Sequence, residues 1–257
     1  MLGKLIKYEF NANSRTFLPM YIALILVAAV NRISRVNMGE ANLAFGISIM
    51  VLVGLFMALG VVTLVVIIQR FNKNLLGDEG YLMFTLPVKV SELIFSKLIV
   101  SFFWNVISAF VSFITFMVLL GDEIPFKEIF TNFGELWREF TKVSLAQLNM
   151  HPIQFILLML ITTILGYTAF IFQVYLSLST AQLPIFNKHR GIIAFVAFFV
   201  INVLLSIGAG VLGMIVPNSL LNTLEKVFGY MIITSLVVCL IEYVGMKYIL
   251  EKHLNLE

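Results

Sequence analysis

Long apolar runs, separated by short polar segments, follow one another along the whole chain. A helix needs roughly 20 predominantly apolar residues to cross the hydrocarbon core of a bilayer. The predicted spans cover residues 16–33, 43–68, 93–120, 152–179, 192–216 and 227–249. The first is short, and the fourth is long enough to require a tilt. The pattern predicts an all-α integral membrane protein with six transmembrane helices, in which residues 1–257 form a single transmembrane domain.

The composition agrees with this prediction. The chain has 257 residues, of which 60% are hydrophobic and 12% are charged, and its mean hydropathy is +1.01. Soluble domains carry about 25% charged residues, and a chain of this length cannot bury so much apolar surface by itself. The single cysteine excludes an intramolecular disulfide. The three histidines lie far apart and lack metal-ligand spacing, so we expect no metal site.

Lys and Arg residues lie mostly on one side of the predicted spans. Cytoplasmic loops carry an excess of these residues. With six spans, eleven of the 17 basic residues fall on the side that also holds both termini. We therefore expect both termini in the cytoplasm. The richer side holds Lys4, Lys7, Arg15, Arg70, Lys73, Lys89, Lys97, Lys188, Arg190, Lys247 and Lys252.

Residues 1–14 precede the first span. Leu2, Leu5, Ile6 and Phe10 recur near helical spacing, with charged residues between them. This favours a short amphipathic helix on the membrane surface over a signal peptide. A plain cytoplasmic cap on the first span is the alternative.

Residues 121–150 join the third and fourth spans and would form an extracellular loop. The middle of this loop reads PFKEIFTNFGELWREFTKV, with apolar residues at three-and-four spacing. We expect an amphipathic helix against the outer leaflet or over the mouth of the protein. A helix packed on the protein's own spans explains the pattern equally well.

Residues 70–92 join the second and third spans and would form a cytoplasmic loop. Within it, two glycines flank an Asp-Glu pair, which indicates a break after the second span. Pro87 favours a kink, and Ser91 favours the start of the next helix. We expect a short helix near 79–85, whose charged and apolar residues suit contact with a partner. The alternative is a solvated turn.

The stretches MLGKLIKYEF and FLPMY, followed by GDEGYLMFTLPV and SELIFSKL, resemble permease subunits of bacterial ATP-binding-cassette (ABC) exporters. The likeness is to the type-2 class, and in particular to the small six-span permeases of Gram-positive bacteria. It covers the whole chain in topology, and it is concentrated in the first hundred residues at the level of individual positions.

This resemblance implies that the loop between spans two and three carries a coupling helix, which docks on a separate ATPase subunit. The coupling residues would be Gly77, Asp78, Glu79, Gly80, Tyr81, Leu82, Phe84, Leu86 and Pro87. Residues 1–14 would be the family's connecting helix, and AQLPIFNKHRG would be a lesser contact. No G-x-x-x-x-G-K-[ST] motif occurs in the chain. The chain would therefore bind no cofactor, while two copies of the partner ATPase bind ATP and Mg²⁺. A second permease copy or close relative would complete the complex.

Polar residues inside the predicted spans are candidates for transport chemistry. Glu242 is an ionisable residue inside the sixth span and a functional candidate. The favoured alternative is a hydrated or paired group near the inner interface. The resemblance implies that spans two and five face the dimer axis, which makes Thr63, Asn202 and Ser206 candidates for a substrate cavity.

These patterns favour an exporter permease that moves amphipathic or hydrophobic cargo, such as membrane-active peptides or drugs, across a bacterial plasma membrane. The main alternative is an ion-coupled secondary transporter without an ATPase partner. That class predicts two similar halves with broken helices, whereas the connecting loops of the two halves differ in length here. An integral membrane enzyme ranks last because no catalytic cluster is visible, and we expect no enzymatic activity of the chain itself.

Overall fold

The computed structural model describes residues 2–38, 43–77, 80, 83, 88–120, 131–186, 189–215 and 223–252. Six of its helices are long and apolar enough to cross a membrane, as expected of a multi-pass membrane protein. They are α1 (Leu2–Met38), α2 (Leu43–Phe71), α4 (Val90–Leu120), α7 (Pro152–Thr180), α8 (Arg190–Ile215) and α9 (Leu224–Lys252). A shorter helix, α6 (Phe133–Val143), precedes α7. The predicted number of apolar helices is confirmed.

The helix ends follow the local sequence closely at α7. Pro152 occupies its first turn, where the missing backbone N–H costs nothing, and the His151 side chain accepts a hydrogen bond from the Ile153 amide. The helix then runs without a break to Thr180, one residue beyond the predicted fourth span.

The start of the chain differs from the expectation of two separate segments. Residues 1–14 and 16–33 were predicted as a surface helix and a span, but α1 runs continuously from Leu2 to Met38. The polar residues near the predicted boundary do not interrupt the helix, and the Ser14 hydroxyl donates to the Asn11 carbonyl. Even Pro19 lies within this helix. Charged residues placed between apolar ones at the start of the chain are thus compatible with one long helix that includes the first span.

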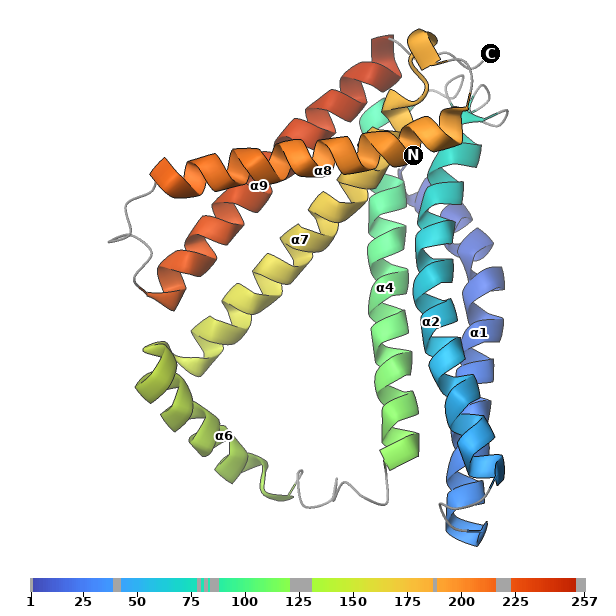
Figure 1. The fold of residues 1–257 in the computed structure, drawn as a ribbon, viewed down its shortest axis with the longest axis vertical. Helices are drawn as coiled ribbons and strands as arrows, with labels where there is room; N and C mark the ends of the chain where they lie inside the picture. The colour runs from blue at the N-terminus through green and yellow to red at the C-terminus, as the bar shows by residue number, and fades with distance from the viewer. Residues whose placement is uncertain are drawn as a thin grey trace. The chain divides into compact units, whose positions relative to one another are not determined.

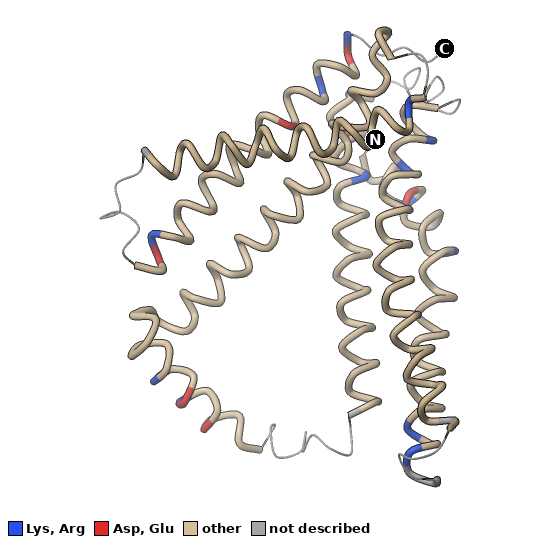
Figure 2. The backbone as a smooth tube through the Cα atoms, viewed as in Figure 1, with Lys and Arg blue, Asp and Glu red and all other residues tan. Residues whose placement is uncertain are grey.

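The described helices fall into two compact units. Unit 1 comprises residues 1–70 and 87–130, and unit 2 comprises residues 71–86 and 131–257. The helices are labelled in Figure 1. Charged residues gather near helix ends and along α6, which leaves most of the length of the long helices free of charge (Figure 2).

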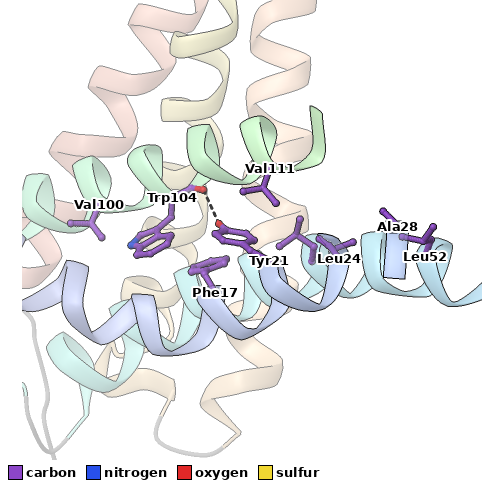
Figure 3. Close-up of a cluster of buried hydrophobic side chains, with 9 residues drawn as sticks. Phe17, Tyr21, Leu24, Ala28, Leu52, Val100, Trp104 and Val111 are labelled. Carbon is purple, nitrogen blue, oxygen red and sulfur yellow. Dashed lines mark hydrogen bonds between the residues drawn. The ribbon is translucent and has the colours of Figure 1, made fainter. Parts of the chain in front are cut away.

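In unit 1, α1 and α4 run in the same direction and form the core (Figure 3). The rings of Phe17 and Trp104 stack with their centroids 5.1 Å apart. One turn further along both helices, the hydroxyls of Tyr21 and Ser108 lie 2.7 Å apart. α2 returns in the opposite direction. Leu52 and Leu59 on α2 join this core.

In unit 2, α7 and α9 run in the same direction. Phe155 contacts Phe228 near their beginnings, and Phe172 contacts Tyr243 further along. α8 runs in the opposite sense to both and packs against α7. The Tyr230 side chain of α9 also reaches α8, where its hydroxyl donates to the Ala209 carbonyl at 2.8 Å. A Cβ atom at Gly213 would lie 3.2 Å from the Tyr230 hydroxyl oxygen, so a small residue is needed there.

The two units share one feature in the order and direction of their three long helices. The first and third helices are parallel and packed together, and the second is antiparallel to them. The units differ in the second helix: α8 crosses α7 obliquely and packs against it, whereas α2 runs alongside α1 and α4 (Figure 1).

Candidate functional site

The predicted coupling segment is described only in part. Asp78, Glu79, Tyr81, Leu82, Phe84, Leu86 and Pro87 lie outside the described residues. Gly77 and Gly80 are described, and the Gly80 amide donates to the Gly77 carbonyl at 2.8 Å. A Cβ atom at Gly77 would lie 3.1 Å from the Lys73 carbonyl oxygen. Glycine at this position therefore allows the chain to turn tightly against the preceding helix.

The residues that lead into this segment from α2 are well packed within unit 2. α2 ends in a π-helical turn, η1 (Asn72–Leu76), in which Asn74, Leu75 and Leu76 are buried. Just before it, the ring of Phe71 stacks on Tyr175 of α7 with a centroid distance of 4.1 Å. Short π-helical turns are common at functional sites. Here the turn and the stacked rings fix the start of the predicted loop.

On the unit 1 side, α4, which follows the predicted loop, shares a buried ion pair with α1. The ammonium nitrogen of Lys97 lies 2.6 Å from Glu9 Oε1, and the two side chains are 4% and 5% exposed. The same nitrogen donates to the Arg70 carbonyl at 3.0 Å. One side chain on α4 therefore ties α1 and the end of α2 together. We call Glu9, Lys97 and the Arg70 carbonyl the clasp.

The clasp was not foreseen from the sequence. Lys97 was counted among the cytoplasmic loop charges, and Glu9 was placed in a surface helix, but the structure buries both. The spacing of both residues along their helices could have indicated that they are buried. Glu9 is four residues before Asn13 and eight before Phe17, so it continues the buried stripe of α1. Lys97 lies seven residues before Trp104 and continues the buried stripe of α4. Opposite charges on two buried stripes indicate a pair.

The three cavity candidates belong to different units. Thr63 belongs to unit 1, and its hydroxyl donates to the Leu59 carbonyl of its own helix at 2.7 Å. Asn202 and Ser206 belong to unit 2, where both are exposed on one face of α8. A cavity shared by all three residues thus stays a prediction.

An apolar groove lies beside that face of α8. Its volume is about 480 Å³, and residues of α8 and α9 line it, among them Leu204, Gly208, Val237 and Ile241. Neither Asn202 nor Ser206 lines it. Its polar side chain, Thr234, donates to the Tyr230 carbonyl of its own helix. The groove offers room for apolar groups and nothing that would bind an ion.

Glu242 is fully buried on the face of α9 that packs against α7. Cys239 and Met246 share this face, and Cys239 Sγ lies 3.8 Å from the Leu165 carbonyl oxygen. Neither carboxyl oxygen of Glu242 has a hydrogen-bond partner among the described residues. A carboxylate without a partner costs several kcal/mol in an apolar interior, whereas a neutral carboxylic acid costs far less. The site therefore suits the neutral form.

A pair of substitutions tests this assignment. Glu242→Gln keeps the shape of the neutral acid and is expected to change the free energy of unfolding in detergent by less than about 1 kcal/mol. Glu242→Lys places a cation in the same site and is expected to cost about 3 kcal/mol or more. The measurement is the thermal unfolding midpoint of each purified variant. A large loss in Glu242→Gln would contradict the neutral form, and small losses in both variants would mean that water reaches the site.

No protein-family model, curated protein or solved structure matches this chain. Within the described ranges, no group of three or more His, Cys, Asp or Glu side chains is placed to hold a metal ion.

Proposed function

We propose that the chain is the membrane-spanning permease subunit of an ATP-driven ABC exporter of the type-2 class. It dimerises with a second copy or a close relative and couples to two copies of a separate ATPase. Both termini and residues 70–92 face the cytoplasm, and residues 121–150 lie outside a bacterial plasma membrane. Its cargo is amphipathic or hydrophobic, such as a membrane-active peptide or a drug.

The clasp is the observation that best supports this proposal. The predicted coupling segment, residues 77–87, is flanked by the end of α2 and the start of α4. Lys97 of α4 holds both the Arg70 carbonyl at the end of α2 and Glu9 of α1. A force that the ATPase exerts on the loop is then transmitted to α1, α2 and α4 together, because Lys97 bonds these three helices to one another. A base fixed in this way suits the movement of spans as rigid bodies.

The proposal is tested by co-purification. The chain is co-expressed with each ABC ATPase subunit of its source organism and captured through a tag on the permease. We expect a stable complex with the native chain and its loss when Asp78, Glu79 and Tyr81 are all changed to alanine. In the proposed complex, the charged and aromatic residues of this segment contact the ATPase, so their removal is expected to abolish most of the docking contacts.

The matched control changes two acidic residues elsewhere, Glu135→Ala and Glu139→Ala on α6. These lie in the predicted extracellular loop, so the complex is expected to survive. If the ATPase binds the triple variant as well as the native chain, the coupling role of this segment is wrong. If no ATPase binds the native chain, the exporter proposal itself fails.

One observation favours the second candidate, an ion-coupled secondary transporter. In both units the first and third long helices are parallel and packed together, which is a feature that internal repeats of such carriers would produce. Consecutive spans alternate in direction, so two three-span repeats would be inverted relative to each other. Against this, the six long helices are continuous through their apolar parts in the described ranges, whereas carriers place discontinuous helices at their sites. Uptake into proteoliposomes driven by an ion gradient alone would establish this candidate instead.

A further inference from the structure

Helix α6 carries a sharply divided surface. Phe133, Leu136, Trp137, Phe140 and Val143 recur at three-and-four spacing and lie along one side. Two acidic and two basic residues lie along the other: Glu135, Arg138, Glu139 and Lys142. No residue of α6 is buried. Phe133 is 61% exposed, Leu136 44% and Val143 47%, so the unit itself leaves much of the apolar side uncovered.

The junction between α6 and α7 is held by specific contacts. A π-helical turn, η2 (Ser144–Leu148), follows α6, and Asn149 then adopts a left-handed conformation with φ of 53°. The buried Ser144 hydroxyl donates to the Met150 carbonyl at 2.7 Å, and the Met150 amide donates back to the Ser144 carbonyl at 3.3 Å. These contacts set α6 across the line of α7 instead of continuing it (Figure 1).

A row of aromatic rings joins α6 to the beginnings of two long helices. Trp137 contacts both Phe133 and Phe140 of α6, with centroid distances of 6.4 and 5.9 Å. Phe140 contacts Phe155 of α7 at 6.4 Å, and Phe155 contacts Phe228 of α9 at 5.9 Å. Nearby, the Gln154 amide donates to the Glu225 carboxylate at 2.8 Å. α6 is therefore fixed at the level where α7 and α9 both begin.

We propose that the apolar side of α6 is embedded in the interfacial layer of the lipid bilayer, at the end where α7 and α9 begin. Two apolar helices long enough to cross a membrane start at this level, so the bilayer surface must pass close to it. Aromatic residues are enriched at this depth, where the headgroups meet the acyl chains. The charged side then faces water, as in other amphipathic interfacial helices. This proposal needs a membrane but does not rest on an ATPase partner or on transport.

The two tryptophans of the chain allow a direct test. Trp104 lies in the core of unit 1, so Trp104→Phe leaves Trp137 of α6 as the sole indole in the full-length protein. In vesicles of phosphatidylcholine brominated near the headgroup end of the acyl chains, Trp137 is expected to lose about half of its emission relative to unbrominated vesicles. Lipids brominated near the chain terminus are expected to quench it less. Aqueous iodide is expected to have little effect.

Two other results would overturn the proposal. Strong quenching by iodide without quenching by brominated lipid would place α6 in water. Protection from both quenchers would mean that protein covers the apolar side, for example a second copy of the chain.

A second pair of variants keeps the test valid if Trp104→Phe fails to fold. In a Cys239→Ala background, Leu136→Cys labels the apolar side of α6 and Glu139→Cys labels the charged side, three residues apart on the same helix. With an environment-sensitive fluorophore attached, only the label at position 136 is expected to shift to the blue and to be quenched by brominated lipid. Equal behaviour of the two labels would contradict the proposal.

Discussion

Lys97→Met is expected to lower the free energy of unfolding by about 3–5 kcal/mol, since it removes the ammonium group that pairs with the buried Glu9 carboxylate. The Glu9 and Lys97 side chains are 5% and 4% exposed, so water cannot readily replace the lost partner. The Arg70 carbonyl loses the same donor. The change is measured as the shift in the unfolding midpoint of the purified protein in detergent.

Two further variants show whether this loss belongs to the clasp. The double variant Glu9→Leu with Lys97→Met replaces both charges by apolar groups, and it is expected to recover most of the lost stability. Lys247→Met breaks the exposed pair of Lys247 and Glu251 on α9, whose side chains are 39% and 45% exposed, and should cost at most about 0.5 kcal/mol. A double variant no more stable than Lys97→Met alone would contradict a role for charge pairing.

Trp104→Ala is expected to destabilise the protein by about 3–5 kcal/mol, because it opens a cavity between α1 and α4. Trp104 is 3% exposed. Its ring stacks on Phe10 at 4.9 Å and on Phe17 at 5.1 Å, so no neighbouring side chain is free to fill the space. Trp104→Phe keeps an aromatic ring in this stack and should cost much less. Thermal unfolding in detergent measures both.

The control for this prediction is Phe110→Ala on the same helix. Phe110 is 63% exposed, so its removal leaves no cavity, and the unfolding midpoint should move little. A loss as large as that of Trp104→Ala would mean that α4 is sensitive to any truncation, and the assignment of the core to the α1–α4 contact would be wrong.

The helices were predictable from the sequence because a bilayer imposes a minimum length on every apolar run. The predicted fourth span, 152–179, differs from α7 by one residue, since proline at its start and a capping histidine define its beginning. The start of the chain was less predictable. Charged residues between apolar ones signal an amphipathic helix, but they do not say whether it joins the span that follows.

The site was predictable only in part, because pairing depends on which helix faces are in contact. Glu242 was identified as an ionisable group inside a span, and its carboxyl oxygens have no side-chain or backbone hydrogen-bond partner among the described residues. The charges of Lys97 and Glu9 could be read from the sequence, but the ion pair between them depends on the parallel packing of α1 and α4. Most of the proposed coupling residues lie outside the described residues, so their role remains a prediction.

The parallel packing of α1 with α4, and of α7 with α9, has a consequence for biosynthesis. Two helices that cross a membrane in the same direction cannot be neighbours in the chain, because the polypeptide must first return through an intervening helix. α7 is therefore synthesised and inserted before its partner exists, and α8, which buries little of its own surface, carries the chain back. A nascent chain halted after α8 holds a completed α1–α4 pair and an α7 that can pack on α8 but still lacks α9. The packing of each unit is completed only after its third long helix has been synthesised.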